Sequence, residues 1–402
     1  MGYTYGLSRL CVNNNLNLNA NWNNFGNSKF ISKINENDSG RMAWHQGFMM
    51  KTYNNIYSKI ISIENLYEAY KKARKSKSNK DYVIKFEKNL FNNLENLHNE
   101  LKNLTYSPKP LETFILRDPK TRIINKSDFK DRIVHHALCN TIGPIFDKSF
   151  IYDSYANRNG KGGVVAIKRF DEFKRRVSQN GRIIKNKFKD NNYVQGYCLK
   201  ADIKHYFNTV DHNILMDLIE RKIKDTETII LIKIILSNFN SEINGKGMPL
   251  GNLTSQFFAN IYLNELDYFI KHKLKAEYYI RYVDDFVILH KNRKQLEVWK
   301  DQIGKFLNVK LKLVLHPEKS KIIHLSQGID FLGFRNFYHF KLLRKRNIKK
   351  MRNKIEMLKK KEIDYTSLLA SYKGWEAYAK WADTYKIRRN MLEKIKQVSF
   401  RS

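Results

Sequence analysis

Apolar residues recur at steps of three and four through four segments of the chain, which is the spacing of one face of an α-helix. These segments are 61–70, 86–101, 128–145 and the run that starts at Leu253. Each helix is therefore predicted to bury one face and to leave its polar face in solvent. The basic segment 72–80 between the first two runs is expected to be a solvated turn.

Residues 197–203 (YCLKADI) alternate between apolar and polar side chains instead. One face of this segment is apolar, and the other carries Cys198, Lys200 and Asp202. Because successive side chains of a strand point to opposite faces, the pattern predicts a half-buried strand. We expect that strand to deliver Asp202 to its exposed face.

Two hairpins are predicted further along the chain. Residues 278–290 (YYIRYVDDFVILH) form two runs rich in β-branched and aromatic side chains, with Asp284 and Asp285 at the tip between them. A second hairpin-like stretch covers 329–343 (IDFLGFRNFYHFKLL). The remaining residues return to a helical spacing, with an apolar stripe that includes Ile355. Helices and antiparallel strands are therefore predicted in one chain.

The chain of 402 residues carries a formal charge of +35, from 74 Lys and Arg against 39 Asp and Glu, while 42% of its residues are hydrophobic. This composition indicates a folded basic protein and excludes a disordered basic tail. At about 100–200 residues per domain, the length allows about two to four domains or subdomains. The charge favours a polyanionic partner, most often nucleic acid. A lysine-rich proteome encoded by an AT-rich genome is the alternative, and composition alone does not separate the two.

The first 48 residues differ from the rest, because they carry a net charge of only +2 and hold nine asparagines within 13–27. We expect this segment to be weakly ordered. The chain has no apolar run near the roughly 18 residues of a membrane span, and its start lacks the apolar core of a secretory signal. Cys11, Cys139 and Cys198 show no C-x-x-C spacing. A soluble protein of the reducing cytoplasm, with no membrane partner, is therefore expected.

The hairpin tip carries two adjacent carboxylates, which repel each other unless a positive charge lies between them. Asp202, on a neighbouring strand, would add a third carboxylate to Asp284 and Asp285. Hard oxygen ligands select Mg²⁺ or Mn²⁺, and two such ions about 3.5–4 Å apart can hold the attacking and leaving oxygens of a phosphoryl transfer. A solvated turn is the ordinary alternative for an Asp-Asp pair taken alone, so the neighbouring motifs decide between the two.

Five motifs occur in an order that resembles the palm of reverse transcriptases. They are DIKHYF (202–207), GMPLGNLTSQ (247–256), YVDD (282–285), HPEKS (316–320) and DFLGF (330–334). The Y-x-D-D motif is weak evidence alone, but five matches in order are strong, and the resemblance covers roughly residues 50–400. It implies an α+β right-hand polymerase with fingers, an antiparallel palm sheet backed by helices, and a helical thumb.

The resemblance also implies roles for individual residues. Asp202, Asp284 and Asp285 would bind two Mg²⁺ ions, with Mn²⁺ as the alternative, and Ile203 would lend its backbone carbonyl. Lys319 would donate a proton to the departing pyrophosphate. The residues around the incoming nucleotide would be the triphosphate-gripping cations Lys120 and Arg122, the steric gate Phe207, and Leu250, Gly251 and Gln256. The primer grip would comprise Phe331, Leu332 and Gly333.

Within the family, the details favour the reverse transcriptases of diversity-generating retroelements, which are encoded by bacteria and phages. Most reverse transcriptases carry Gln-Gly and Ser-Pro where this chain has Leu250-Gly251 and Ser255-Gln256. The likeness implies errors at template adenines, which diversify a target protein. It further implies a structured template RNA that primes cDNA synthesis, dNTPs as substrates, and a basic oligomeric accessory protein as partner.

Three other functions share part of this pattern. A reverse transcriptase of another bacterial class would serve phage defence or a group II intron; the intron type is disfavoured because no nuclease domain or C-x-x-C set follows the thumb before Ser402. An RNA-binding protein with a weak polymerase site is opposed by the presence of all three aspartates. An RNA-templated RNA polymerase commonly has Gly-Asp-Asp at the hairpin and a smaller or acidic residue in place of Phe207.

The expected domains are an Asn-rich extension (1–48), fingers and palm (49–335) and a basic helical thumb (336–402), the last with 19 basic and 6 acidic residues over 341–402. His135 and His136 are expected to be structural helix residues. Three further aromatic residues are expected to pack the thumb helices, with stacking on nucleic acid as the alternative; they are Trp375, Tyr378 and Trp381.

Overall fold

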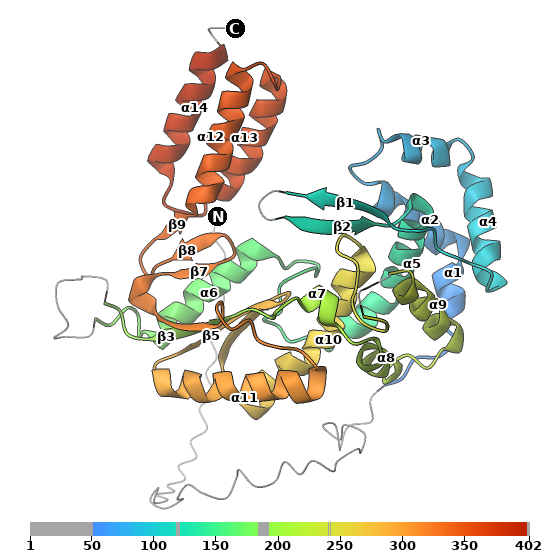
Figure 1. Ribbon diagram of the computed structural model, residues 1–402, viewed down its shortest axis with the longest axis horizontal. Coiled ribbons are helices and arrows are strands. Elements are labelled where there is room, and N and C mark those ends of the chain that lie inside the picture. Colours follow the sequence, from blue (N-terminus) through green and yellow to red (C-terminus); the bar gives the residue numbers. More distant parts are fainter. Residues whose placement is uncertain (1–50, 118–120, 184–192, 240, 242, 400–402) are drawn as a thin grey trace, which may run out of the picture. The chain divides into compact units, whose positions relative to one another are not determined.

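The computed structural model describes residues 51–117, 121–183, 193–239, 241 and 243–399 (Figure 1). The Asn-rich segment 1–48 and the predicted finger cation Lys120 lie outside the described residues. The helices are α1 (Tyr57–Ile61), α2 (Ile63–Arg74), α3 (Asp81–Glu87), α4 (Leu90–Lys102), α5 (Phe129–Asp147), α6 (Gly163–Val177), α7 (Tyr206–Thr209), α8 (His212–Glu220), α9 (Thr226–Ser237), α10 (Leu253–Tyr268), α11 (Arg293–Leu311), α12 (Lys345–Lys359), α13 (Tyr365–Ala379) and α14 (Tyr385–Ser399), with a π-helical turn at Phe269–Lys273 and a 3₁₀ turn at Leu325–Gln327. The strands are β1 (Glu112–Leu116), β2 (Arg122–Lys126), β3 (Tyr197–Ala201), β4 (Tyr278–Tyr282), β5 (Asp285–His290), β6 (Lys321–His324), β7 (Ile329–Phe331), β8 (Phe334–Asn336) and β9 (Lys341–Leu343).

The helices α1, α2 and α4 pack around one another and against α5. α5 begins after Asp128, whose carboxylate accepts a hydrogen bond from the backbone N–H of Lys130, as an N-cap residue does. The run predicted as one helix over 86–101 is split, because α3 ends at Glu87 and α4 begins at Leu90. β1 and β2 form an antiparallel hairpin between α4 and α5.

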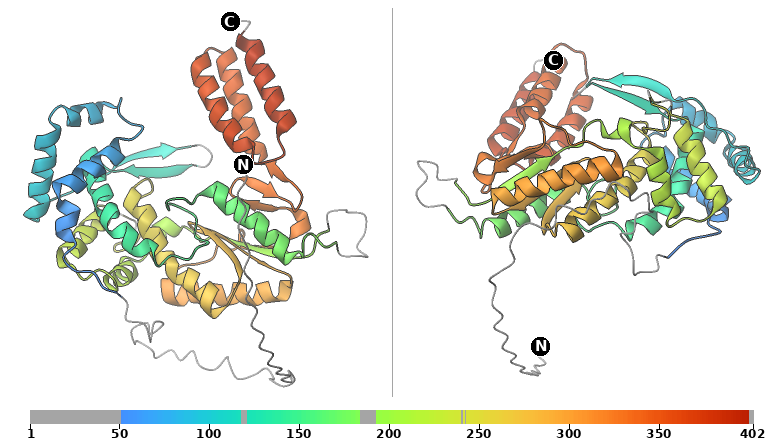
Figure 2. Two further views of the ribbon diagram at one scale, coloured as in Figure 1. Left: turned by 180° about the vertical axis from the view of Figure 1, so that it is seen from behind. Right: turned by 60° about the horizontal axis from the view of Figure 1, so that its bottom comes forward.

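Four strands form an antiparallel sheet in the order β4-β5-β3-β6. One face of this sheet packs against α10 and α11, through residues that include Leu199 and Ile288. The other face packs against α6 and β7, through Ile280 and Val287. The helices α6 and α11 accordingly lie on opposite sides of the sheet (Figures 1 and 2). Both faces of the central strands are therefore covered.

The predicted exposed face of 197–203 is wrong for most of its length. Cys198 is fully buried in the core beneath α6, and the side chain of Lys200 is only 17% exposed. The strand was expected to be half-buried because its polar residues alternate, but α6 and β7 come from distant parts of the sequence and cover that face. Asp202 emerges just past the end of β3 and is 9% exposed.

Beyond the sheet, β7, β8 and β9 form a three-stranded antiparallel sheet, and α12, α13 and α14 pack together on a small apolar core (Figure 1). Tyr378 on α13 contacts Phe334 on β8 at a ring-centroid distance of 4.6 Å. Trp375 lies beside it, against the same cluster of side chains, and Trp381 is 36% exposed. Tyr378 therefore packs α13 against β8, while Trp375 also contacts the apolar core of α12, α13 and α14.

Helices and antiparallel sheets thus combine as the predicted α+β class, with the four-stranded sheet backed by helices. The helices predicted from Asp128 and Leu253 and the hairpin over 278–290 are confirmed as α5, α10 and the β4–β5 pair. Within the described residues, no helix combines the length and the apolar character that crossing a membrane requires.

The histidines of α5 predict how stability responds to acid. Burial lowers the pKa of His135 to about 3 and that of His136 to about 4, from an ordinary value of 6.5. The unfolded chain therefore binds protons at these histidines that the folded chain does not bind. The free energy of unfolding consequently falls as the pH drops below 6.5 towards 4. Each histidine should add up to about 1.4 kcal/mol per pH unit to this loss of unfolding free energy.

Denaturant unfolding of His135→Phe between pH 7 and 4.5 measures this effect. The variant, whose ring retains most of the buried shape, is expected to show a shallower loss of unfolding free energy than the parent. An equally steep loss in both proteins would contradict the assignment of His135 as a buried neutral side chain.

Candidate active site

The antiparallel register of β3 and β5 brings carboxylates from two distant segments together. Ala201 pairs with Phe286, so one further step along the ladder sets Asp202 across from Asp285. Asp284 immediately precedes Asp285 in the turn between β4 and β5. The three aspartates predicted from the sequence therefore meet at one end of the four-stranded sheet.

The turn that presents Asp284 is strained. β4 ends at Tyr282 and β5 begins at Asp285, so Val283 and Asp284 alone connect the two strands. Val283 has a φ of 56°, a left-handed conformation that β-branched residues rarely adopt. The predicted Asp284-Asp285 tip is thus displaced by one residue, because Asp285 already belongs to β5.

Burial and neighbouring charges raise the pKa of Asp284 and of Asp285. The pKa of Asp284 is raised from 3.8 to about 6, mainly by burial and further by the charges of Asp202 and Asp285. Burial also raises the pKa of Asp285, while Lys200, whose Nζ lies 3.9 Å from Oδ1 of Asp285, lowers it. Ionising all three carboxylates is therefore unfavourable unless cations compensate them.

Two of the cations predicted from the sequence, on different segments, face this cluster. Lys319, which is 44% exposed, places its Nζ 2.6 Å from Oδ2 of Asp202. Arg122, at the start of β2, is exposed, and its positive charge lowers the pKa of Asp284. The predicted proton donor and one predicted finger cation thus lie near the aspartates, while Lys120 lies outside the described residues.

The donor set fits a divalent cation by its chemistry. Asp202, Asp284 and Asp285 supply only hard oxygen ligands, and the raised pKa of Asp284 reports a negative cluster that a cation would relieve. Within the described residues, no three His, Cys, Asp or Glu side chains already stand as a ready coordination group. The carboxylate of Asp202 is instead paired with Lys319, which would have to yield to a metal ion.

Phe207 lies on the short helix α7, five residues after Asp202. The chain leaves β3 through Ile203, which bridges Leu315, and turns at His205, whose φ is 48°. Phe207 is partly buried, and its backbone carbonyl accepts a hydrogen bond of 2.7 Å from the N–H of Met248. This bond joins the predicted gate to the Gly-containing motif at 247–256.

The segment around Leu250 contacts the β1–β2 hairpin. The carbonyl of Leu250 accepts a hydrogen bond of 2.9 Å from the N–H of Asn125 on β2. Gly251 has a φ of 113°, and a Cβ there would lie 2.9 Å from Cγ2 of Ile124, so only glycine permits this approach. Gln256 lies partly buried in the first turns of α10. The segment 247–256 thus links the β1–β2 hairpin to α7 and α10.

The predicted primer grip forms the β7–β8 turn. Phe331 is buried against Phe170 of α6, with a centroid distance of 5.5 Å, while Leu332 and Gly333 both have positive φ. The carbonyl of Leu332 accepts a hydrogen bond of 3.0 Å from the hydroxyl of Tyr378 on α13. The turn is therefore attached to the helices that follow it.

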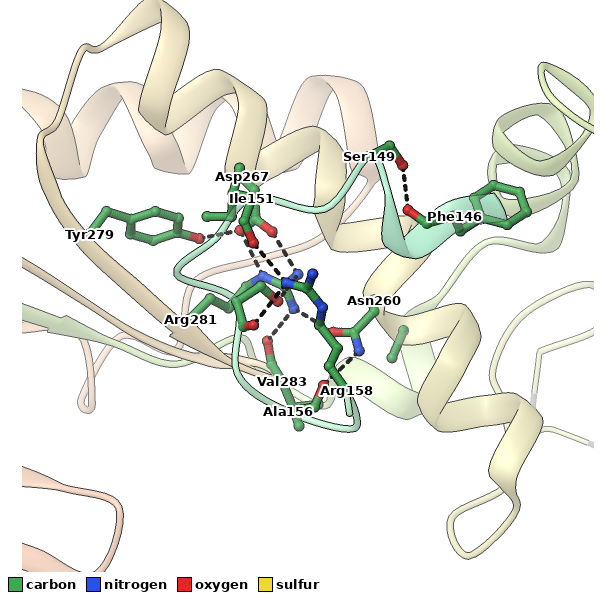
Figure 3. Close-up of polar contacts among 12 residues, drawn as sticks. Phe146, Ser149, Ile151, Ala156, Arg158, Asn260, Asp267, Tyr279, Arg281 and Val283 are labelled. Atoms are coloured by element: carbon green, nitrogen blue, oxygen red, sulfur yellow. Dashed lines mark hydrogen bonds and ion pairs between the residues drawn. The ribbon is translucent and has the colours of Figure 1, made fainter. Parts of the chain in front are cut away.

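One part of the site was not anticipated from the sequence. Arg281, three residues before Asp284, is fully buried and pairs with the equally buried Asp267 of α10 (Figure 3). A charged residue inside an otherwise apolar strand pattern (YYIRY) was the available signal, because charged residues are rarely buried without a partner. Lys200, beside Asp285, was also missed as a site residue.

The chain is similar in sequence to known proteins. Residues 109–336 match the family model described as reverse transcriptase (RNA-dependent DNA polymerase). Protein YkfC of Escherichia coli (strain K12) is 26% identical over 294 residues, which cover 63% of this chain and 72% of YkfC. The group II intron-encoded protein LtrA of Lactococcus lactis subsp. cremoris is 27% identical over 304 residues, which cover 58% of this chain but only 48% of LtrA.

Among solved structures, apo telomerase from Candida tropicalis aligns with a TM-score of 0.43 and 14% identity, covering 61% of this chain and 59% of that one. The family model alone spans more than half of the 402 residues and contains all three aspartates. The chain belongs to the reverse transcriptase (RNA-dependent DNA polymerase) family.

Proposed function

We propose that the chain copies an RNA template into DNA, with Asp202, Asp284 and Asp285 holding two divalent cations, Mg²⁺ or Mn²⁺. The observation that carries the proposal is the β3–β5 register, which brings Asp202 across from Asp285 beside the strained turn. Bound metal would lower the pKa of the primer 3′-hydroxyl and neutralise charge on the triphosphate. The backbone carbonyl of Ile203 is a candidate additional ligand.

The chain's own residues would position the reactants. Arg122, on the β1–β2 hairpin, lowers the pKa of Asp284 by its charge and would contact the triphosphate, together with Lys120. Phe207 would lie beneath the sugar and exclude a 2′-hydroxyl. Lys319 would release Asp202 and donate a proton to the departing pyrophosphate.

The template-primer duplex would lie against the β7–β8 turn and the basic helices attached to it. Phe331, Leu332 and Gly333 would support the primer end, and the net charge of +13 over 341–402 would neutralise phosphates. We propose the division into an extension (1–48), fingers and palm (49–335) and thumb (336–402) on the same basis. β8 spans the boundary at residue 336 and pairs with β9. The primer-grip hairpin would therefore move together with the start of the thumb.

The test is primer extension by the purified chain on an RNA template, with dNTPs and Mg²⁺, followed by digestion of the product with DNase and RNase. The proposal expects a DNA product whose sequence follows the template. Template-independent addition of nucleotides, or a product made only from rNTPs, would contradict it.

We further propose membership of the diversity-generating subgroup, with adenine-directed errors and a basic oligomeric accessory protein as partner. Leu250-Gly251 and Ser255-Gln256 support this assignment. A group II intron-like reverse transcriptase is the second candidate, which the likeness to LtrA favours. The two differ in error spectrum and in the RNA that each would bind.

Leu250→Gln is expected to lower misincorporation opposite template adenine about 2- to 10-fold, since one added hydrogen bond to the nucleotide sugar contributes about 0.5–1.5 kcal/mol. The backbone bond from Asn125 to Leu250 does not depend on the side chain, so the fold should be retained. Sequencing of primer-extension products measures the error spectrum, with Leu250→Met as the apolar control. An unchanged spectrum in Leu250→Gln would remove the link between this position and fidelity.

A further inference from the structure

The strained turn that carries Asp284 is held by a contact from the strand before it. Nη1 of Arg281 donates a hydrogen bond of 3.2 Å to the backbone carbonyl of Val283. Val283 is the residue with the unfavourable φ of 56°, and strain of this kind persists only where surrounding contacts hold it. Arg281 is therefore placed to keep the turn in its observed conformation.

The guanidinium of Arg281 is itself fixed on every side. Its five N–H donors all find acceptors, which is the full capacity of an arginine. The acceptors are Oδ1 of Asp267 at 2.7 Å, Oδ2 of Asp267 at 2.6 Å, Oδ1 of Asn260 at 3.0 Å, Oγ of Ser154 at 3.0 Å and the carbonyl of Val283. A lysine has three donors and lacks the planar fork, so it could keep the charge but not this set of bonds.

The partners of Arg281 come from segments that are far apart in the sequence. Asp267 and Asn260 lie on α10, and Asn260 in turn donates a hydrogen bond of 2.9 Å to the carbonyl of Ala156. Tyr279 on β4 donates a hydrogen bond of 2.7 Å to Asp267 without contacting the turn (Figure 3). The side chain of Arg281 thus joins the β4–β5 hairpin to α10 and to the loop at 154–156.

We propose that Arg281 is a positioning residue, which sets Asp284 and Asp285 for metal binding by holding the carbonyl of Val283 from a buried, fully bonded guanidinium. This inference rests on the proposed function, because it requires that the two aspartates bind metal. Metal affinity would then depend on Arg281, a buried side chain that touches neither metal nor substrate.

Arg281→Lys tests the proposal. Loss of the residues that orient metal ligands typically weakens metal binding about 10- to 100-fold, and we expect a rise of that size in the Mn²⁺ concentration at the midpoint of two titrations. The first follows the Mn²⁺-induced shift in melting temperature, which needs no catalysis. The second follows primer extension. A folded Arg281→Lys protein with an unchanged Mn²⁺ midpoint in the first titration would overturn the proposal.

Tyr279→Phe is the matched control, because it removes a hydrogen bond to the same Asp267 and leaves the turn untouched. It is expected to lower the melting temperature while its Mn²⁺ midpoint stays at the parent value. An equal shift in both variants would mean that any damage to the network weakens metal binding, and Arg281 would lose its particular role.

If Arg281→Lys does not fold, Asn260→Ala provides the test. It removes an acceptor that shares Nη1 with the carbonyl of Val283 but spares the ion pair with Asp267. A smaller rise in the Mn²⁺ midpoint supports the proposal, because Nη1 is then held by the carbonyl of Val283 alone, and an unchanged midpoint overturns it. Where Arg281→Lys does fold, adding Val283→Gly should lower the midpoint again, since glycine adopts a positive φ without strain. Failure of that rescue would also count against the proposal.

The two titrations separate this inference from the proposed function. A parent chain that binds Mn²⁺ but extends no primer contradicts the proposed function and leaves the positioning role standing. A parent chain that extends primers while Arg281→Lys keeps its Mn²⁺ midpoint contradicts only the positioning role.

Discussion

Asp284→Asn is expected to reduce dNTP incorporation by at least about 10³-fold. The variant loses one oxygen ligand and the charge that metal binding requires, and metal-assisted phosphoryl transfer owes several kcal/mol of transition-state stabilisation to that arrangement. Burial and the charges of Asp202 and Asp285 raise the pKa of Asp284 to about 6, so its negative charge is one that a bound cation would relieve. Single-turnover primer extension at saturating Mg²⁺ measures the loss.

The same variant should not be less stable than the parent. The folded-state pKa of Asp284 lies above its ordinary value of 3.8, so the ionised carboxylate destabilises the fold, and the cost is fully present above about pH 6. In EDTA at pH 7, Asp284→Asn is therefore expected to melt at or above the parent temperature, and this advantage should shrink as the pH falls towards 4. Asp217→Asn, on the exposed face of α8, is the control and should change neither activity nor melting. Retained activity in Asp284→Asn would remove this aspartate from the reaction.

Phe207→Ala is expected to raise incorporation of rNTPs relative to dNTPs by about 10- to 200-fold in kcat/KM. Steric exclusion of one small group is worth about 1–3 kcal/mol in other enzymes, and the proposed gate is a partly buried phenyl ring on α7, five residues after Asp202. The bond from Met248 to the Phe207 backbone persists in the variant, so α7 should keep its position. Parallel kinetics with matched dNTP and rNTP pairs measure the ratio.

Phe269→Ala provides the comparison for loss of packing. Phe269 is also partly buried against the main core, where it stacks on Phe306, but it lies in the π-helical turn after α10. It should lower stability without altering sugar selection. Equal dNTP and rNTP use by the parent chain, or an unchanged ratio in Phe207→Ala, would refute the gate.

Local patterns in the sequence predicted the elements that carry the aspartates. The alternation over 197–203 gave β3 with Asp202 at its end, and the β-rich runs around YVDD gave β4 and β5. These predictions succeeded because a strand and its turn are largely determined by residues within a few positions of each other. The expected α+β architecture came from the order of the motifs.

Features that depend on distant segments could not be predicted in the same way. Cys198 is buried because α6 and β7 cover a face of β3 that its neighbours in sequence suggested was exposed. The pairing of Arg281 with Asp267 is visible only once α10 packs beneath the hairpin. The left-handed Val283 breaks a local preference, and its carbonyl is held by Arg281, whose side chain is itself fixed by tertiary bonds to α10.

The most direct test of the proposed site is anomalous diffraction from crystals of the chain with an RNA–DNA template-primer, a non-hydrolysable dNTP and Mn²⁺. We predict two anomalous peaks about 3.5–4 Å apart, bound by Asp202, Asp284 and Asp285 and by the phosphates of the nucleotide. A bound nucleotide whose phosphates lie away from these carboxylates, or Mn²⁺ bound elsewhere with this cluster still paired to Lys319, would contradict the account.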